Sequence, residues 1–193
     1  MYKNVFKRIL DFWAALILLI LLSPIMAIVA LLVAKKMGRP VIFSHTRSGV
    51  DQKPFRVFKF RTMIDAPELS DSERITNFGL LLRKLSLDEL PQFYNVLIGD
   101  MSLIGPRPLL PEYDEHYTEE QMIRFTVRPG ISGLAQVSGR NGLSWEKKFA
   151  YDVEYVKQLS FWGDVKILLK TVVVVLGSAG FSPAGEDKKF SEK

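Results

Sequence analysis

Two adjacent carboxylates, Asp88 and Glu89, are the residues of this sequence whose type and spacing first suggest chemistry. A Gly-Pro-Arg-Pro segment places Arg107 eighteen residues after Glu89, and the flanking prolines restrict where the Arg107 side chain can point. Neighbouring residues on a helix point in different directions, so the two acids would divide roles rather than flank one bond as in a glycosidase. An ionised aspartate can attack phosphorus, and a carboxylate can hold Mg²⁺. The pair therefore suggests phosphoryl chemistry with a nucleophile and a metal ligand.

The same pair also has a purely structural explanation. Ser86 and Glu89 fit the capping-box pattern, in which two side chains bond the free amides at a helix start. Acids in a first helical turn gain from the helix dipole, which keeps them ionised and also attracts phosphate. For an isolated Ser-x-x-Glu the structural explanation is the better one, so any catalytic interpretation depends on the surrounding residues.

Basic residues supply the countercharge that a phosphorylated substrate would need. The chain has a net charge of +5, and arginine donates two parallel hydrogen bonds to phosphate. Each cation taken alone is better explained as surface charge. As a set they suit a phosphorylated substrate, although the net charge alone would also suit nucleic acid or anionic lipid; the family resemblance described below implies no nucleic-acid partner. The candidates are Lys59, Arg61, Arg83, Arg107, Arg128 and Arg140.

An apolar segment at residues 12–34 decides the broad class of the protein. It contains 23 residues without charge, and Ser23 is its single polar side chain. A straight helix of this length would reach roughly 34 Å, enough to cross a bilayer. Lys35 and Lys36 follow it directly, which argues against a cleaved signal peptide. The sequence thus predicts a membrane protein.

Ser23 and Pro24 lie at the midpoint of this segment, where proline removes a backbone hydrogen bond. Cations flank both ends, and the positive-inside tendency places each end in the cytoplasm. A helix broken at Ser-Pro that enters and leaves by one leaflet satisfies both flanks, with Ser23 bonding a carbonyl freed by the proline. From the residues alone, this re-entrant form and a kinked spanning helix are equally good. The flanking cations are Lys3, Lys7, Arg8, Lys35, Lys36 and Arg39.

The remaining pattern predicts an α+β fold that is predominantly helical, with a small β element and amphipathic helices at the membrane interface. No cysteine is present, so no disulfide framework can form. Strands are expected within 40–49 and 53–63, and a loop over 65–76. Helices are expected over 78–85, 113–125, 145–159 and 161–176, and a further helix is expected to begin at Ser86. Residues 128–142 are expected to form a glycine-rich loop or hairpin, and residues 180–193 a disordered polar tail.

Several longer motifs resemble the bacterial sugar transferases, in particular their small monotopic phosphoglycosyl transferases of the PglC type. The resemblance runs from Met1 to about Gly177 and includes "LLSP", "KFRTM", "RKLSLDELPQFYNVLIGDMSLIGPRP", "RPGISGLAQVSGR" and "LSFWGDVKILLKT". It implies that a UDP-sugar donates its phosphosugar to undecaprenyl phosphate with release of UMP. It also favours the re-entrant form of the helix, anchored in membrane lipid at the cytoplasmic face of the bacterial inner membrane.

The resemblance also implies roles for individual residues. Asp88 would be the nucleophile that forms a covalent aspartyl-phosphosugar, and Glu89, with Asp88, would hold Mg²⁺. Lys59, Arg83 and Arg107 would surround the phosphates, and Asp164 matches a further active-site acid. Pro108 and Gln136 lie within the matching motifs and complete the expected substrate-binding set.

The boundaries expected from this resemblance are an anchor at residues 1–36, a catalytic domain at 37–179 and a tail at 180–193. The leading donor is a UDP-linked N-acetylated amino sugar such as UDP-diacetylbacillosamine, with protein glycosylation as the pathway and downstream glycosyltransferases as partners. The alternative is a hexose phosphate, glucose or galactose, for capsule or O-antigen. A non-catalytic membrane scaffold would explain the anchor and the charge but not the acidic pair beside the Pro-Arg-Pro turn.

Overall fold

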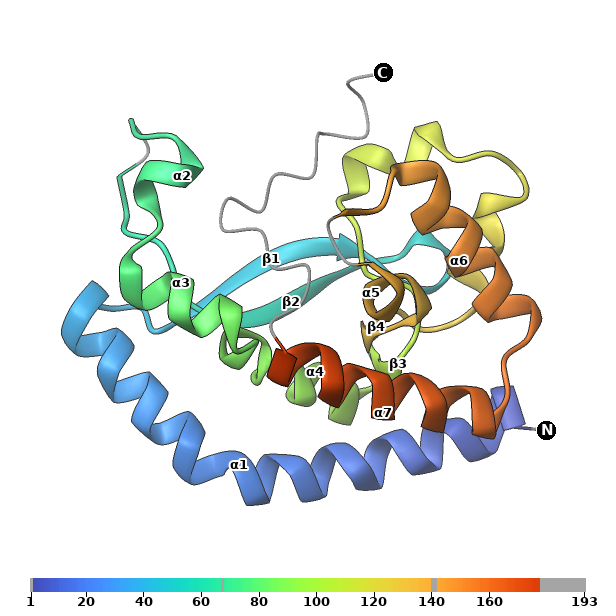
Figure 1. The fold of residues 1–193 in the computed structure, drawn as a ribbon, viewed down its shortest axis with the longest axis horizontal. Coiled ribbons are helices and arrows are strands. Elements are labelled where there is room, and N and C mark those ends of the chain that lie inside the picture. Colours follow the sequence, from blue (N-terminus) through green and yellow to red (C-terminus); the bar gives the residue numbers. More distant parts are fainter. Residues whose placement is uncertain (1, 67, 140–141, 178–193) are drawn as a thin grey trace.

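The computed structural model describes residues 2–66, 68–139 and 142–177 of the chain (Figure 1). The fold is mostly helical with two small sheets, as predicted. A short π-helix, η1 (Tyr2–Phe6), leads into the long helix α1 (Lys7–Met37). Figure 1 shows α1 as a bow along one side of the molecule, below the hairpin of β1 (Ile42–Ser48) and β2 (Pro54–Phe60). The predicted polar tail lies outside the described residues.

Helix α1 is curved but not interrupted, which corrects the predicted break at Ser23-Pro24. Pro24 has no N–H, so the carbonyl of Ile20 loses its usual partner. The Ser23 hydroxyl donates to that carbonyl at 2.8 Å, as the sequence predicted. Because a side chain replaces the missing backbone donor, the helix can bend at proline without leaving a polar group unpaired.

Both ends of α1 are buried against the rest of the protein, whereas its centre is more exposed. Near the start, Asp11 and Ala15 are buried, and Ala15 joins a core cluster with Val96 of α4 (Gln92–Ile98). Near the end, Val29 and Val33 pack on the hairpin and on α3 (Asn77–Lys84). None of residues 16–28 is buried. The helix is therefore packed most deeply at its two ends and is more exposed between them.

The hairpin of β1 and β2 forms the middle of the molecule. Its strands pair antiparallel, joined by a short 3₁₀ turn, η2 (Val50–Gln52). Asn95 of α4 holds the outer edge of β2, accepting from the Phe58 amide and donating to the Arg56 carbonyl. Because Asn95 is fully buried, these bonds replace water for two edge groups and fix α4 against the strand.

The segment around Asp88 differs from the predicted capping box. Ser86 adopts a left-handed conformation with φ 54° and makes no side-chain cap bond. A single 3₁₀ turn, η3 (Leu87–Glu89), then leads through Pro91 into α4. Glu89 is free of the capping role because its carboxylate is held by Lys59 on β2 instead. The predicted loop over 65–76 contains one short helix, α2 (Asp71–Arg74).

A parallel pair of short strands corrects the predicted loop or hairpin over 128–142. β4 (Gly130–Ser132) pairs with β3 (Ser102–Ile104), and α5 (Leu134–Ser138) follows. Gly130 permits this pairing, since a Cβ there would lie 2.1 Å from the Gly105 nitrogen. The predicted helix over 113–125 is instead two 3₁₀ segments, η4 (Pro111–His116) and η5 (Gln121–Thr126).

Two helices close the fold, at the places predicted. α6 (Trp145–Lys157) and α7 (Phe161–Gly177) both contact α5. Tyr155 and Ile167 pack with Ile104 in one core cluster. In Figure 1, α7 runs close above the first half of α1, and this arrangement brings the Asp164 side chain to the start of the long helix.

Candidate active site

The acidic pair lies between the hairpin and the Gly-Pro-Arg-Pro segment. Asp88 is 6% exposed, and within the described chain its only hydrogen bond is to its own backbone amide. Glu89 accepts from the Lys59 ammonium at 2.6 Å, and the Arg107 Nη1 lies 3.8 Å from the same oxygen. Glu89 is therefore paired with cations, whereas Asp88 is buried without a hydrogen bond to another described residue.

The two carboxyls have opposite electrostatic environments. Burial, and then the charge of Glu89, raise the pKa of Asp88, while Lys59 and Arg83 oppose that rise. Burial also acts on Glu89, but the charges of Lys59 and Arg107, with hydrogen bonds from Lys59 and Gln92, lower its pKa to about 2. Glu89 is thus ionised at neutral pH, and Asp88 is the more basic carboxylate of the two.

Three of the predicted phosphate-binding cations gather at this pair. Lys59 comes from β2, Arg107 from the loop after β3, and Arg83 from the last turn of α3. The Arg83 Nε donates to Thr62 at 3.0 Å, which orients the guanidinium. Cations from three separate segments converge on adjacent carboxylates, an arrangement suited to stabilising phosphoryl charge.

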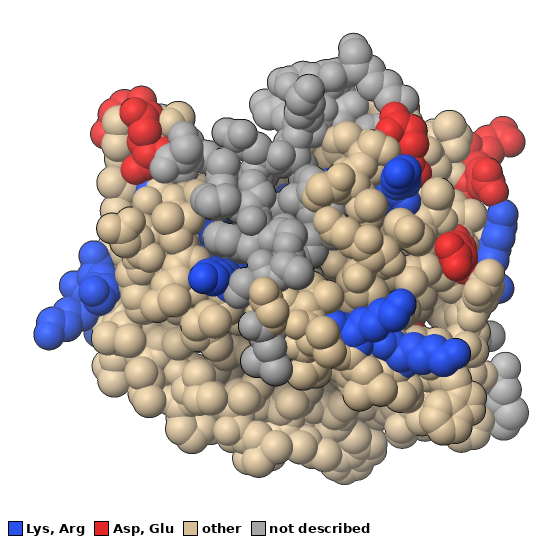
Figure 2. Space-filling model, viewed as in Figure 1, with Lys and Arg blue, Asp and Glu red and all other residues tan. Residues whose placement is uncertain are grey.

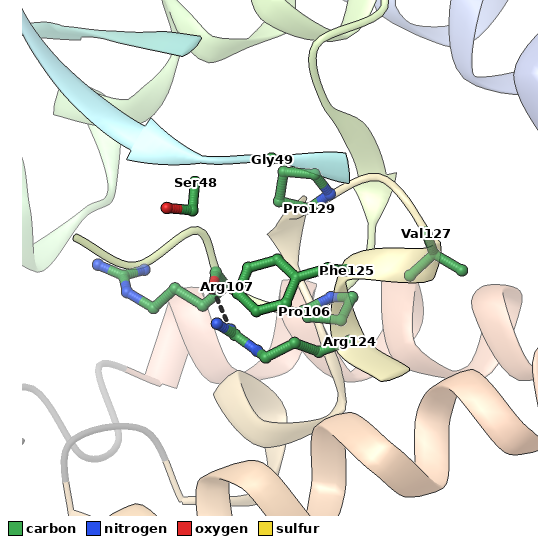
Figure 3. Close-up of a pocket in the computed structure, with 8 residues that line it drawn as sticks. All are labelled: Ser48, Gly49, Pro106, Arg107, Arg124, Phe125, Val127 and Pro129. Carbon is green, nitrogen blue, oxygen red and sulfur yellow. Dashed lines mark hydrogen bonds between the residues drawn. The ribbon is translucent and has the colours of Figure 1, made fainter. Parts of the chain in front are cut away.

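The backbone of Arg107 is fixed by a residue that the sequence analysis missed. Arg124 is buried, pairs with Asp152 at 3.1 Å and donates to the Arg107 carbonyl at 2.6 Å. Figure 3 shows this bond, with the Arg107 side chain extending away from Arg124. Pro108 follows directly. The pocket that the residues in Figure 3 line has a volume of about 10 Å³, room for little more than one water molecule, so it is too small for a nucleotide.

The other predicted site residues lie away from the acidic pair or make other contacts. Arg61 donates to the carbonyls of Met63 and Pro40, and Arg128 to that of Gly99. Gln136 bonds Ile131 through its amide nitrogen, while its oxygen is buried without a partner. Asp164 accepts from Tyr2, Lys7 and Tyr155 at 2.6–2.9 Å, so both of its oxygens are occupied. Arg140 lies outside the described residues.

A family model described as bacterial sugar transferase matches residues 2–178. The chain belongs to this family. The sequence-based identification is thereby confirmed, and with it the expectation of an enzyme of the sugar transferase class.

Similar proteins extend the picture of this sugar transferase. It is 51% identical to the uncharacterized sugar transferase EpsL of Bacillus subtilis, over 91% of this chain and 90% of that protein. It is 41% identical to the UDP-glucose:undecaprenyl-phosphate glucose-1-phosphate transferase of Escherichia coli, over 88% of this chain and 40% of the enzyme. It is 37% identical to the undecaprenyl-phosphate galactose phosphotransferase of Salmonella typhimurium, over 90% of this chain and 41% of that protein. The chain thus spans about two fifths of the length of the Escherichia coli and Salmonella typhimurium relatives.

The donor set of the sugar transferase fits Mg²⁺ in one particular way. No cluster of three or more acidic or histidine ligands occurs in the described ranges. Asp88 and Glu89 offer two carboxylates, and Glu89 already shares an oxygen with Lys59. Mg²⁺ is usually held by one or two carboxylates plus substrate phosphates. The pair therefore fits an ion that arrives with a nucleotide better than one held by protein alone.

Apolar side chains cover the outer surface of α1 and α7. Figure 2 shows the lower edge of this view, where Figure 1 places α1, without Lys, Arg, Asp or Glu. Helix α1 is long and apolar enough to cross a membrane, and only 11% of its most apolar stretch is buried, unlike the core helix of a soluble protein. The most exposed apolar residues of these helices are Ile20, Leu21, Leu31, Trp162, Leu169 and Val173.

Proposed function

We propose that this enzyme transfers a hexose-1-phosphate from a UDP-hexose to undecaprenyl phosphate and releases UMP. The observation that carries the proposal is the buried Asp88, whose pKa is raised beside a cation-bound Glu89. A carboxylate kept from water and from strong hydrogen bonds is a good nucleophile toward phosphorus.

The proposed reaction has two displacements at one phosphorus atom. An Asp88 carboxylate oxygen attacks the phosphorus that bears the sugar, and the bond to the bridging oxygen breaks. That oxygen keeps the electron pair and leaves as part of UMP. A phosphate oxygen of undecaprenyl phosphate then attacks the same phosphorus, and the bond to Asp88 breaks, restoring the carboxylate. No proton has to be moved in either step.

Lys59, Arg83 and Arg107 offset the repulsion between an anionic nucleophile and two anionic substrates. Lys59 also forms an ion pair with Glu89, with 2.6 Å between the Lys59 Nζ and the Glu89 Oε1 atoms. This ion pair holds the Glu89 carboxylate in place next to Asp88. Mg²⁺, when bound through the carboxylates and the substrate, would neutralise further phosphate charge. Asp164 takes no part in these steps, since its oxygens are filled by donors of the chain itself.

The choice of a hexose rests on the relatives. Those with assigned donors carry names of glucose or galactose transferases, including the galactosyl transferase CpsE of Streptococcus agalactiae, 42% identical over 90% of this chain and 43% of that protein. These names favour the alternative that the sequence analysis held, a hexose phosphate, over the N-acetylated amino sugar that it put first.

We further propose that α1 enters and leaves the cytoplasmic leaflet without crossing it. Lys7 is bound to Asp164, and Arg8 donates to the carbonyls of Val96 and Leu97 at 2.6 and 2.8 Å. The other end packs through Val33 in the core. Since both ends are held by one domain while the apolar centre is unburied, a bent helix in one leaflet satisfies every contact. A lipid acceptor could then meet the site at the membrane surface.

The covalent step can be tested by mass spectrometry. The purified protein is incubated with UDP-glucose or UDP-galactose and no lipid acceptor. We expect the mass of one hexose phosphate to be added, and the peptide carrying Asp88 to bear it. Asp88→Asn should show no adduct. Transfer that proceeds with no protein-bound species, in rapid-quench samples of the complete reaction, would refute the two-step proposal.

The anchor can be tested by replacing Pro24 with alanine. A straighter helix would extend across the bilayer and carry its N-terminus to the opposite side. A tag at Met1 should then become protected from a protease or label added to the cytoplasmic face, while Ser23→Ala, which keeps the proline, should leave the tag accessible. A tag that is equally accessible in both variants would show that the bend does not set topology.

A further inference from the structure

Arg47, on β1, carries a feature that the catalytic proposal does not use. Its guanidinium nitrogen Nη1 is buried and has no hydrogen-bond partner. Buried donors in folded proteins are almost always paired, because an unpaired one keeps the full cost of lost hydration. A charged donor left in this condition points to an acceptor that the protein chain does not itself provide.

The position of Arg47 connects it to the active site. Lys59 lies opposite Phe43 in the hairpin, and Arg47 lies four residues beyond Phe43 on the same strand. Residues at even spacing share one face of a sheet, so Lys59 and Arg47 lie on the same face. The two positions are roughly 13 Å apart along the strand at 3.3 Å per residue.

The charge of Arg107 acts both on Glu89, the partner of Lys59, and on Arg47. The Arg107 Nη1 is 3.8 Å from Glu89, and the backbone of its loop is fixed to β1 by the bond from the Ser48 amide to the Leu109 carbonyl at 3.1 Å. Burial, followed by the charge of Arg107, lowers the pKa of Arg47 to about 10, which leaves Arg47 protonated at neutral pH. Tyr113 and then Glu112 partly oppose this effect, but Glu112 makes no ion pair with Arg47 in the described part of the chain.

Arg47 and Arg107 are near enough for the charge of one to lower the pKa of the other, and like charges repel each other. A phosphate between them would supply the missing acceptor for Arg47 and offset the repulsion, since arginine binds phosphate oxygens with charge-assisted bonds. Asp88, Lys59 and Glu89 are already assigned to the phosphorus that bears the sugar. The anion beside Arg47 must therefore be a different one.

We propose that Arg47 and Arg107 together bind the nucleotide's other phosphate, the one that leaves as UMP. This inference rests on the proposed function. In the first displacement the electron pair of the broken bond moves to the bridging oxygen, and negative charge grows on that phosphate. Arg47 stabilises this charge from the side away from Asp88, so it acts on the departing group and not on the transferred one.

The test compares two ligands that differ by the phosphate, UMP and uridine, in binding to full-length protein. Arg47→Met should weaken UMP binding by about 10- to 100-fold, the range expected for a lost charge-assisted bond, and leave uridine binding unchanged. Arg47→Lys should recover part of the UMP affinity. The matched control is Arg56→Met, which removes an exposed arginine from the opposite face of the same hairpin and should change neither affinity.

Each result separates this inference from the proposed function. If Arg47→Met binds UMP as tightly as the unchanged protein, or loses UMP and uridine affinity equally, the phosphate role is refuted even though hexose phosphate transfer continues. Thermal unfolding of the same samples checks that the variant is folded. The unchanged protein could form no hexose phosphate adduct while Arg47→Met still weakens UMP binding relative to it. In that case the transfer proposal fails and the phosphate site stands.

Discussion

Asp88 and Asp164 are buried to nearly the same degree, 6% and 7% exposed, yet their surroundings differ completely. Asp164 receives hydrogen bonds from Tyr2, Lys7 and Tyr155, and Lys7 neutralises its charge at 2.7 Å. Asp88 receives none from another described residue, and its closest charged neighbour along the chain is another acid. Under the proposed function, the buried carboxylate whose bonds are complete is structural, and the one whose bonds are incomplete is the nucleophile.

Asp88→Asn should break this comparison most clearly. We expect UMP release to fall by at least about 10³-fold, as for loss of a nucleophile, while the thermal midpoint rises. The folded-state pKa of Asp88 is raised, so its ionised form destabilises the fold above that pKa, and a neutral amide removes the penalty. Activity assays and thermal unfolding in detergent measure the two effects. Retained turnover would remove Asp88 from the nucleophile role.

Asp164→Asn should do the reverse. Lys7 would lose its closest counterion inside the protein, which costs about 3 kcal/mol of unfolding free energy. Denaturant unfolding measures the loss, with Glu120→Gln as the control because the Lys157–Glu120 pair is exposed and should have no measurable effect. Should Asp164→Asn keep full stability and lose catalysis instead, the acid would belong to the active site.

Glu89→Gln tests the other half of the acidic pair. The variant keeps a similar shape but loses the charge that Lys59 and Arg107 neutralise. We expect the Mg²⁺ concentration needed for half-maximal activity to rise about tenfold, in line with losses of supporting groups at metal sites. An unchanged Mg²⁺ titration would rule out Glu89 as a ligand.

The smallest expected effect is a shift in pH dependence. Asp88 must be ionised to attack, so activity falls as the pH drops through its raised pKa. Lys59 opposes that rise, so Lys59→Gln should raise the pKa of Asp88 further and move the acid limb of kcat/KM to higher pH. Arg56→Gln, with an exposed arginine, should leave the limb in place. A limb that moves to lower pH would contradict the assigned electrostatics.

Local patterns predicted much of the fold. The hairpin, α3, α6 and α7 appear where alternation and helical spacing placed them, because such elements bury a face that the sequence already displays. The pairing of β3 with β4 was missed, since short parallel strands are set by non-local contacts. The two segments over 113–125 were taken for one α-helix, although each is 3₁₀.

The site could also be predicted only where it depends on residues that are close together in the sequence. Asp88 and Glu89 stand side by side in the sequence, and their motif identified the family. The capping box failed because Lys59, thirty residues earlier, competes for Glu89, and no local rule can anticipate that partner. Arg124 and Arg47 were overlooked because isolated arginines look like surface charge. Arg124 stands between aromatic residues that bury it, including Phe125, and that neighbourhood was the available signal.

The double attachment of α1 has a consequence for how the protein can be handled. Ala15, Val29 and Val33 complete two of the core clusters, so removing the helix would uncover the residues beneath it rather than release a water-soluble catalytic fragment. The apolar helix α1 is therefore also part of the hydrophobic core of the folded protein. With α1 in lipid as proposed, folding and insertion would have to be completed together, and a truncated version should aggregate instead of working in solution.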